Sequence, residues 1–312
     1  MLRIVEHRYW FFLLSALVLV PGIIALILWG LPLSIDFTGG TVYEVAFDDP
    51  AKVSETGLHE VFAANGFTDI QVVEARETGT EKRIFQMRSA TVDPVQKAAL
   101  AAAMQERFGT FEERLFDSVG SSVGSEVSRK AGIAVALAAL GIAIYLTVMF
   151  RNVPHPVRYG VCAITAMVHD IFVVLGLAAI LGHFLHWEVD ALFLTALLTV
   201  ISFSVHDTIV VFDRIRENVG RLRGLRFDTV VNHSIIQTLD RSINTQLTAL
   251  FTLVAIFIYS GGQLQRFVFW LLIGIISGTY SSIFNAAPLL VVWENREWRN
   301  WFRRGGSETA TA

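Results

Sequence analysis

Six apolar runs, each long enough to cross a lipid bilayer, recur along this chain of 312 residues. A helix needs roughly 20 apolar residues to cross a hydrocarbon core about 30 Å thick. The composition agrees, because 53% of the residues are hydrophobic and only 17% are charged, whereas a soluble domain has roughly 25% charged residues. We therefore predict a polytopic α-helical membrane protein with six transmembrane helices, at residues 11–31, 131–150, 159–184, 191–212, 243–259 and 267–293.

The first and fifth runs differ from the others. The first run, at about 21 residues, is longer than the apolar core of a secretory signal peptide, so we expect it to remain as a span. The fifth run is the least apolar, because five polar residues dilute it. These are Asn244, Thr245, Gln246, Thr248 and Thr252.

The charges between the runs are distributed unevenly. Residues 32–130 carry 16 acidic and 10 basic side chains, whereas arginines gather at the opposite ends of the runs. Positively charged loops are typical of the cytoplasmic side of a membrane. We therefore expect both termini in the cytoplasm and residues 32–130 on the other side. The arginines concerned are Arg3, Arg8, Arg151, Arg158, Arg214, Arg216, Arg221, Arg223, Arg226, Arg296, Arg299, Arg303 and Arg304.

Residues 32–130 are too long for a simple connection and are expected to form a domain. The predicted elements follow the order strand, helix, strand, strand, helix, strand, which is the βαββαβ pattern of an α+β ferredoxin-like domain. We find no nucleophile–base pair, metal-ligand spacing or phosphate loop in this segment, so we expect a protein that is not an enzyme and that needs no cofactor or metal. The predicted strands are 41–47, 70–75, 83–89 and 111–119, the helices 50–65 and 93–108, and the turn between the middle strands 77–82.

The predicted domain ends in "SVGSSVGSEV", residues 118–127. Segments rich in glycine and serine are typically flexible. Two interpretations remain open, a plain linker and a hinge that lets the domain swing relative to the second span. The chain is thus divided into 1–31 (N-terminus and first span), 32–130 (outer domain with its hinge), 131–293 (the remaining spans) and 294–312 (cytoplasmic tail).

Ionisable residues stand within the apolar runs, where such residues are rare and usually functional. His169 and Asp170 lie in the third run, His206 and Asp207 in the fourth, and Arg241 just before the fifth. Helices rise about 1.5 Å per residue, which places Asp207 and Arg241 within about one turn of the same depth on antiparallel helices. These two side chains can therefore form an ion pair.

Two opposed influences would then act on the charge of Asp207. A neighbouring arginine favours the carboxylate, whereas removal from water favours the neutral acid. Such a group suits a proton carrier, because a small movement of Arg241 would change its charge. The alternative is that Asp207 only bridges helices. His206 points about 100° away from Asp207 on a helix, and we interpret it either as a packing residue or as a second relay site.

The sixth run carries small residues at four-residue spacing, Gly274, Gly278 and Ser282. Small side chains at this spacing allow helices to pack closely. Asn285 follows on the same stretch and is a candidate for lining a polar path. After the first run, two glycines are expected to allow a tight exit into the first strand. This turn consists of Asp36, Phe37, Thr38, Gly39 and Gly40.

Four segments of the chain resemble the SecD/SecF family of bacterial protein-export membrane proteins, within the RND superfamily. They are "IDFTGGTVYEV" (35–45), "VHDIFVVLG" (168–176), "HDTIVVFDRIREN" (206–218) and "LLIGIISGTYSSIFNAAPLLV" (271–291). The DFTGG turn is shared by both branches of the family, and "VVFDRIREN" favours the SecF branch. His206 departs from the family pattern, which usually has asparagine there.

The resemblance implies an inner-membrane subunit that works with SecD at the SecYEG channel and uses the proton motive force to drive late stages of preprotein export. It also implies that residues 32–130 are periplasmic, and that contacts exist with YajC, YidC, the preprotein and the lipid bilayer but not with nucleic acid. Either H⁺ or Na⁺ fits as the coupling ion. The candidate ion-conducting residues are Asp207, Arg241, Asp170, His169, His206 and Asn285.

Two other functions remain as alternatives. An RND-type exporter of small molecules would share the span pattern, but such exporters usually carry two large outer domains, and this chain has one short domain. A passive assembly subunit would carry no ion flux at all. Proton flux, measured with and without an ionisable Asp207, distinguishes these alternatives from the coupled export subunit.

Overall fold

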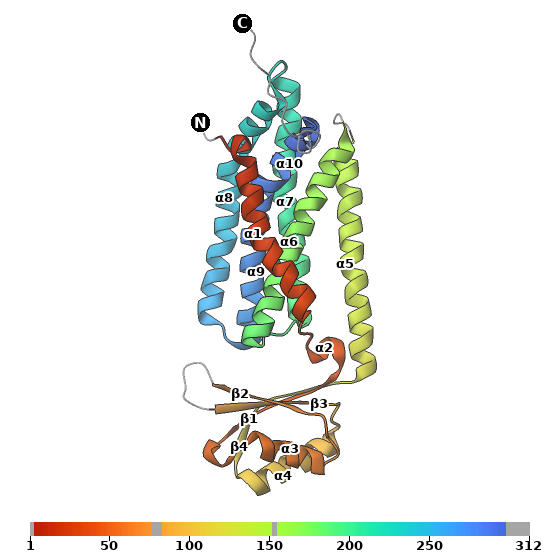
Figure 1. The fold of residues 1–312 in the computed structure, drawn as a ribbon, viewed down its shortest axis with the longest axis vertical. Coiled ribbons are helices and arrows are strands. Elements are labelled where there is room, and N and C mark those ends of the chain that lie inside the picture. Colours follow the sequence, from red (N-terminus) through yellow and green to blue (C-terminus); the bar gives the residue numbers. More distant parts are fainter. Residues whose placement is uncertain (1–2, 77–82, 152–154, 298–312) are drawn as a thin grey trace, which may run out of the picture. The chain divides into compact units, whose positions relative to one another are not determined.

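The computed structural model describes residues 3–76, 83–151 and 155–297. Within these ranges it contains six helices that are long and apolar enough to cross a membrane, which confirms the prediction from hydropathy. The chain divides into two compact units (Figure 1). One unit is Leu33–Ile133, and the other is the helical unit formed by the rest of the described chain.

The helical unit is built from long helices joined by short connections. The sixth span is continuous from Gly262 to Glu294, because α9 passes into α10 through a π-helical segment, η3. A π-helix closes hydrogen bonds five residues apart and often marks a functional position. The elements are α1 (Arg8–Trp29), α5 (Ser121–Met149), α6 (Pro156–Leu185), α7 (Ala191–Arg221), α8 (Phe227–Tyr259), α9 (Gly262–Tyr280), η3 (Ser281–Ala286) and α10 (Ala287–Glu294).

Local sequence signals set several helix boundaries. The Asp190 carboxylate accepts a hydrogen bond from the Phe193 backbone N–H at 2.7 Å, which satisfies a free donor in the first turn of α7. Pro156 opens α6, where its missing N–H is not needed. α8 begins at Phe227 rather than near residue 243, because its polar first half escapes a search for apolar runs.

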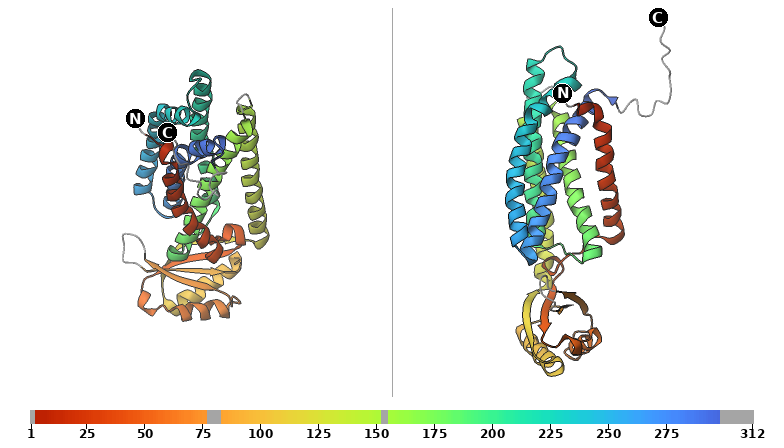
Figure 2. Two further views of the ribbon diagram at one scale, coloured as in Figure 1. Left: turned by 45° about the horizontal axis from the view of Figure 1, so that its top comes forward. Right: turned by 90° about the vertical axis from the view of Figure 1, so that its left-hand side faces the viewer.

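α7 packs against α6, α8 and α9, and α1 packs against α6. Both views in Figure 2 show α1 and α6 side by side. The contact between α7 and α9 depends on small residues: a Cβ on Gly274 would overlap the Val200 side chain, and one on Gly278 would lie 3.1 Å from the Ser204 Cα. The absence of these side chains lets the two backbones approach closely.

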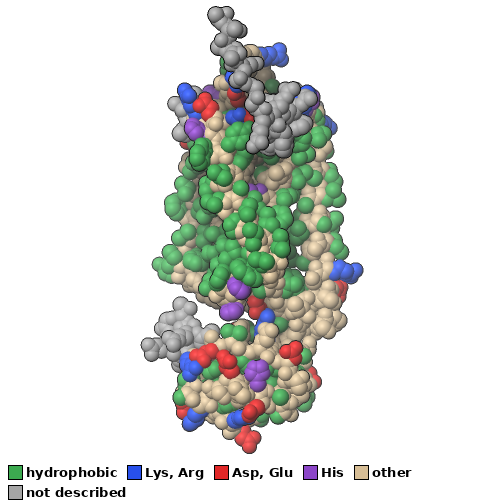
Figure 3. Space-filling model, in the orientation of Figure 1, with side chains coloured by type: hydrophobic (Ala, Val, Ile, Leu, Met, Phe, Trp, Pro, Cys, Tyr) green, Lys and Arg blue, Asp and Glu red, His purple; other side chains and the backbone are tan. Residues whose placement is uncertain are grey.

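The outer surface of the helical unit is largely apolar. Figure 3 shows hydrophobic side chains over most of its visible face, with charged side chains gathered at the end that carries the N-terminus. Large apolar side chains such as Trp10, Leu17 and Ile27 of α1 and Leu137 of α5 are exposed. Such a surface is stable against lipid or another apolar helix, and not against water.

The unit Leu33–Ile133 has the predicted βαββαβ order. Its sheet is antiparallel with the order β2-β3-β1-β4, and α3 and α4 cover one face (Figure 1). The turn expected at 77–82 lies outside the described residues. The elements are β1 (Gly40–Phe47), α3 (Glu55–Ala64), β2 (Gln71–Arg76), β3 (Arg83–Ser89), α4 (Pro94–Phe108) and β4 (Phe111–Val119).

Alternation along the strands creates the core of this domain. Tyr43 of β1 pairs with Met87 of β3 and Phe116 of β4, and all three contribute to the layer under the helices. Leu58 of α3 and Leu100 of α4 are fully buried against that layer. Because every second strand residue points to the same side, this one pattern defines a single apolar face for both helices.

The turn of residues 36–40 packs against the first turn of α5. Ser34 caps the short helix α2 (Ile35–Thr38), and Gly39 follows with φ of 74°, which favours glycine. A Cβ on Gly39 would lie 2.6 Å from the Ser121 Cα, and a Cβ on Gly124 would lie 2.5 Å from the Gly39 nitrogen. The two glycines therefore permit a close approach of backbone to backbone.

This contact explains why residues 118–127 differ from the flexible joint that their composition suggests. β4 extends to Val119 and α5 begins at Ser121, so Gly120 alone lies between strand and helix. The joint expected from composition thus consists of the end of a strand and the start of a helix in this structure. Here the small residues permit close packing. A swing of the domain at this point stays a prediction.

Candidate functional site

Asp170 is the most highly connected ionisable residue among the described spans. Its side chain is 1% exposed and accepts hydrogen bonds from the hydroxyl groups of Ser204 at 2.5 Å, Ser281 at 2.6 Å and Ser277 at 2.7 Å. These serines belong to α7, η3 and α9, respectively. A buried carboxylate thus joins α6 to three neighbouring elements, with both of its oxygens satisfied.

His169 completes this cluster on α6. Its Nδ1 lies 3.0 Å from Asp170 Oδ1, and its side chain is 10% exposed. Its Nε2 is buried and has no hydrogen-bond partner within the described part of the chain. The sequence placed both residues near the middle of a span, and the structure brings them into one hydrogen-bonded group.

Asp207 lies on α7 in a different environment. Its side chain is 2% exposed, and its Oδ2 accepts one hydrogen bond, from Gln246 Nε2 of α8 at 2.7 Å. The partner is a neutral amide, so this buried carboxyl group has no hydrogen-bonded cation in residues 3–76, 83–151 and 155–297. Asp207 is therefore less tightly held than Asp170.

The expected ion pair between Asp207 and Arg241 is absent from the described structure. Gln246 donates the hydrogen bond to Asp207, and Arg241 is exposed on α8. Depth alone does not decide which residue of α8 meets Asp207, because the direction of a side chain depends on helical phase. Five residues advance a helix by about 500°, which turns Arg241 about 140° away from the direction of Gln246.

The remaining candidates form no hydrogen bond with either carboxyl group in the described structure. His206 is exposed on α7, in keeping with its position about 100° around the helix from buried Asp207. Asn285 of η3 exchanges hydrogen bonds with Ser15 of α1, at 2.7 and 3.0 Å. In the described chain, no hydrogen bond joins Asn285 to Asp170 or Asp207, so its polar contact ties α1 to η3.

A second polar chain runs beside the Asp170 cluster. Thr208 and Ser282 share a hydrogen bond of 2.9 Å, and the Ser282 hydroxyl also lies 3.1 Å from the Ser204 carbonyl oxygen. Ser282, predicted as a packing residue, therefore both packs and hydrogen-bonds at α7. This chain links η3 to the turn of α7 that carries Asp207, without a hydrogen bond to the carboxyl group itself in the described structure.

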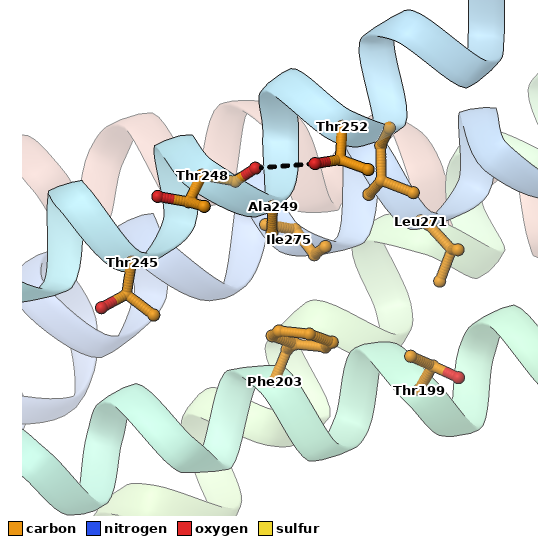
Figure 4. Close-up of a pocket in the computed structure, with 9 residues that line it drawn as sticks. Thr199, Phe203, Thr245, Thr248, Ala249, Thr252, Leu271 and Ile275 are labelled. Atoms are coloured by element: carbon orange, nitrogen blue, oxygen red, sulfur yellow. Dashed lines mark hydrogen bonds between the residues drawn. The ribbon is translucent and has the colours of Figure 1, made fainter.

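A groove of about 640 Å³ opens between α7, α8 and α9 (Figure 4). Thr248 and Thr252 line it, but their hydroxyl groups donate to backbone oxygens of Asn244 and Thr248. Thr199 and Thr245 also line the groove, and its remaining side chains, such as Phe203 and Leu271, are apolar. It lacks the titratable groups that ion transfer needs, so the two carboxyl clusters remain the better candidate sites.

Sequence reasoning missed the neutral partners of both carboxyl groups. Ser277 and Ser281 stand four residues apart on one helix face, which is a weak signal in a span full of small residues. Gln246 was noted only as a polar residue that weakens the fifth span. In the described residues, no group of three or more histidine, cysteine, aspartate or glutamate side chains is placed to hold a metal ion.

Comparison with known proteins identifies relatives over the whole chain. The family profile "Protein export membrane protein SecD/SecF, C-terminal" matches residues 99–296, and the "SecD/SecF GG Motif" profile matches residues 30–51. Protein translocase subunit SecF of Thermobaculum terrenum is 49% identical over 99% of both chains. The SecF subunit of Anaerolinea thermophila is 49% identical over 98% of both chains.

A solved structure extends this comparison to the fold. The crystal structure of SecDF from Thermus thermophilus, a translocon-associated membrane protein, matches 95% of this chain with a TM-score of 0.80 and 30% identity. This chain spans 39% of that longer protein. The glycine turn, the multi-pass helical unit and the βαββαβ domain thus occur together in known relatives. The chain belongs to the SecD/SecF family of protein-export membrane proteins.

Proposed function

We propose that this chain works with SecD at the SecYEG channel and couples the proton motive force to late stages of preprotein export. In this proposal Asp207 takes up and releases the coupling proton. One observation carries it: Asp207 is a buried carboxyl group in a membrane span and is hydrogen-bonded to a neutral amide. The names of the relatives, translocase subunits SecF and the joined SecDF, support the partner and the process.

The physical argument concerns what an apolar span can hold. A carboxylate without a cation is expensive inside a membrane, so such a residue is retained where it has a task. Asp170 has four polar neighbours that hold both oxygens in place, whereas Asp207 has a single neutral donor. Because Asp207 is held by fewer contacts, it is the better candidate to change its proton content. Asp170 with His169 is the second station in this proposal.

The proposal places the chain in a bacterial inner membrane with both termini in the cytoplasm. The uneven distribution of arginine supports this orientation. The domain Leu33–Ile133 would then be periplasmic, where it can meet the emerging preprotein. No role as direct partner of Asp207 is retained for Arg241, because Gln246 takes that position.

Asp207→Asn tests the proposal, because asparagine keeps the shape of aspartate but cannot ionise. We expect the variant to retain association with SecD and to lose the part of preprotein export that depends on the proton gradient. Export can be followed in inverted membrane vesicles with and without a protonophore. Gradient-dependent export at the wild-type rate would contradict the proposal and favour a passive assembly subunit, whereas export of small molecules by the complex would favour a transporter.

A further inference from the structure

We propose that Gln246 is the switchable hydrogen-bonding partner of Asp207: its carboxamide donates to the charged carboxylate and turns over to accept a hydrogen bond from the neutral carboxylic acid. This inference rests on the proposed proton uptake by Asp207 and assigns a positioning residue to that step. It follows from the contact between the two side chains, from their burial and from an unpaired oxygen on Gln246.

The hydrogen bond to Asp207 requires a partner that suits both the charged and the neutral form of its carboxyl group. Gln246 is 3% exposed and Asp207 is 2% exposed, so water cannot readily replace their hydrogen bond of 2.7 Å. An ionised carboxylate only accepts hydrogen bonds, whereas a carboxylic acid also donates one. A carboxamide carries a donor and an acceptor on the same group, and arginine carries donors alone. Gln246 can therefore remain bonded to Asp207 in both forms.

The unpaired atom of Gln246 is the acceptor that the second form needs. Oε1 is buried and has no hydrogen-bond partner among the residues that the structure describes. A buried polar atom without a partner is unfavourable and calls for a functional reason. Rotation of the amide by about 180° exchanges the positions of Oε1 and Nε2. The proton that arrives binds to an Asp207 oxygen and then points to Oε1, and no bond of Gln246 breaks.

The same face of α8 also offers a place for the displaced N–H group. Ser242 stands one helical turn before Gln246, is 2% exposed, and has a buried Oγ that lacks a partner within residues 3–76, 83–151 and 155–297. Residues four apart lie about 5–6 Å from each other on a helix. Neither Gln246 Oε1 nor Ser242 Oγ has a partner in the described structure, so the Ser242 hydroxyl reaches Nε2 only when its own side chain rotates as the amide turns.

The basic residues nearest in sequence to the pair do not offer this exchange. His206 on α7 and Arg241 on α8 are exposed and form no hydrogen bond with Asp207 in the described structure. α9 packs on both helices. Between Phe267 and the end of α9 there is one titratable side chain, Tyr280. Its hydroxyl donates to the Phe11 carbonyl oxygen at 2.7 Å. The amide is therefore the group in direct contact that can follow the proton.

Infrared difference spectroscopy tests the proposal on the full chain, purified with SecD and placed in lipid bilayers. Spectra at high and low pH give the carboxyl band of Asp207, identified by its loss in Asp207→Asn. Carbon-13 labelling of glutamine gives the amide carbonyl band, and Gln246→Leu identifies the contribution of Gln246. Gln265→Leu is the matched control, because the Gln265 amide donates to the Phe257 carbonyl oxygen at 3.2 Å, away from Asp207.

Two linked shifts are expected. In the wild type the Gln246 carbonyl band moves to lower frequency when Asp207 takes up its proton, because Oε1 then accepts a hydrogen bond. In Gln246→Leu the Asp207 carboxyl band moves to the higher frequency of an acid that donates no hydrogen bond, and Gln265→Leu matches the wild type. An amide that donates to Asp207 in both forms would also shift the Asp207 band when leucine replaces it, but its own carbonyl band would stay in place on proton uptake, so the Gln246 band separates a switching role from a structural one.

The outcomes separate this inference from the proposed function. Normal proton flux in Asp207→Asn would refute the proposed function, and the two bands would still show whether amide and acid switch together. An Asp207 band at the same frequency in Gln246→Leu as in the wild type would overturn the inference. A Gln246 band that ignores proton uptake would overturn it too, as would the absence of any carboxyl band that Asp207→Asn removes.

Discussion

Replacement of Gly39 by alanine should destabilise the domain Leu33–Ile133 for two separable reasons. Gly39 has φ of 74° and ψ of 168°, a region that is essentially restricted to glycine and costs another residue about 1–3 kcal/mol. The new Cβ would also lie 2.6 Å from the Ser121 Cα, and overpacking of this kind costs about 1–3 kcal/mol more. The expected loss in free energy of unfolding is about 2–6 kcal/mol.

Gly109→Ala is a matched control in the same domain. Gly109 has φ of 89° and ψ of −163°, but a Cβ there meets no atom within 4 Å. It should therefore lose only the backbone part, about 1–3 kcal/mol. Hydrogen exchange followed by mass spectrometry on the full chain measures both losses, and Gly39→Ala alone should loosen the first turn of α5. Equal losses in the two variants, with α5 unaffected, would refute the packing argument.

Three further predictions concern the core, the helix contact and the orientation. Leu100→Ala removes a fully buried side chain and should lower the domain's free energy of unfolding by about 2–5 kcal/mol in the same exchange experiment. Gly274→Val should lower the thermal stability of the purified chain, and Val200→Ala should restore part of it by removing the side chain that Gly274 contacts. Val95 of α4 is 79% exposed, so Val95→Cys should react with a membrane-impermeant thiol reagent from the periplasmic side. The native Cys162 is buried. Labelling from the cytoplasmic side alone would reverse the proposed orientation.

Most of the fold follows from two features of the sequence: the length of the apolar runs, and the order of predicted strands and helices in residues 32–130. Apolar runs of membrane length predict spans because the requirement is set by the thickness of the bilayer. α8 shows the limit of this approach: it begins at Phe227, but its first half carries many polar residues. Two of them, Ser234 and Gln237, accept hydrogen bonds from the Asn218 amide of α7. A search for apolar runs therefore misses this half of the helix.

The site was harder to predict because it depends on helical phase. The depth estimate pairs Asp207 with Arg241, yet Gln246, five positions later, faces Asp207. The serines around Asp170 come from three elements, and no local pattern shows that they converge. Composition was also misleading at residues 118–127, where glycine and serine permit close packing against Gly39. The composition of a segment and the position of a residue along its helix can be taken from the sequence. The direction in which the side chain points relative to the other helices requires the packed structure.

Proton flux through the reconstituted complex tests the central claim most directly. The chain with SecD is placed in lipid vesicles that contain a pH-sensitive dye, and an inward-acting proton gradient is applied. Asp207→Asn should reduce the flux to that of empty vesicles, while Asp240→Asn, which changes an exposed carboxyl group on α8, should leave it at the wild-type rate. Wild-type flux in Asp207→Asn would contradict the account and leave Asp207 as a residue that joins α7 to α8.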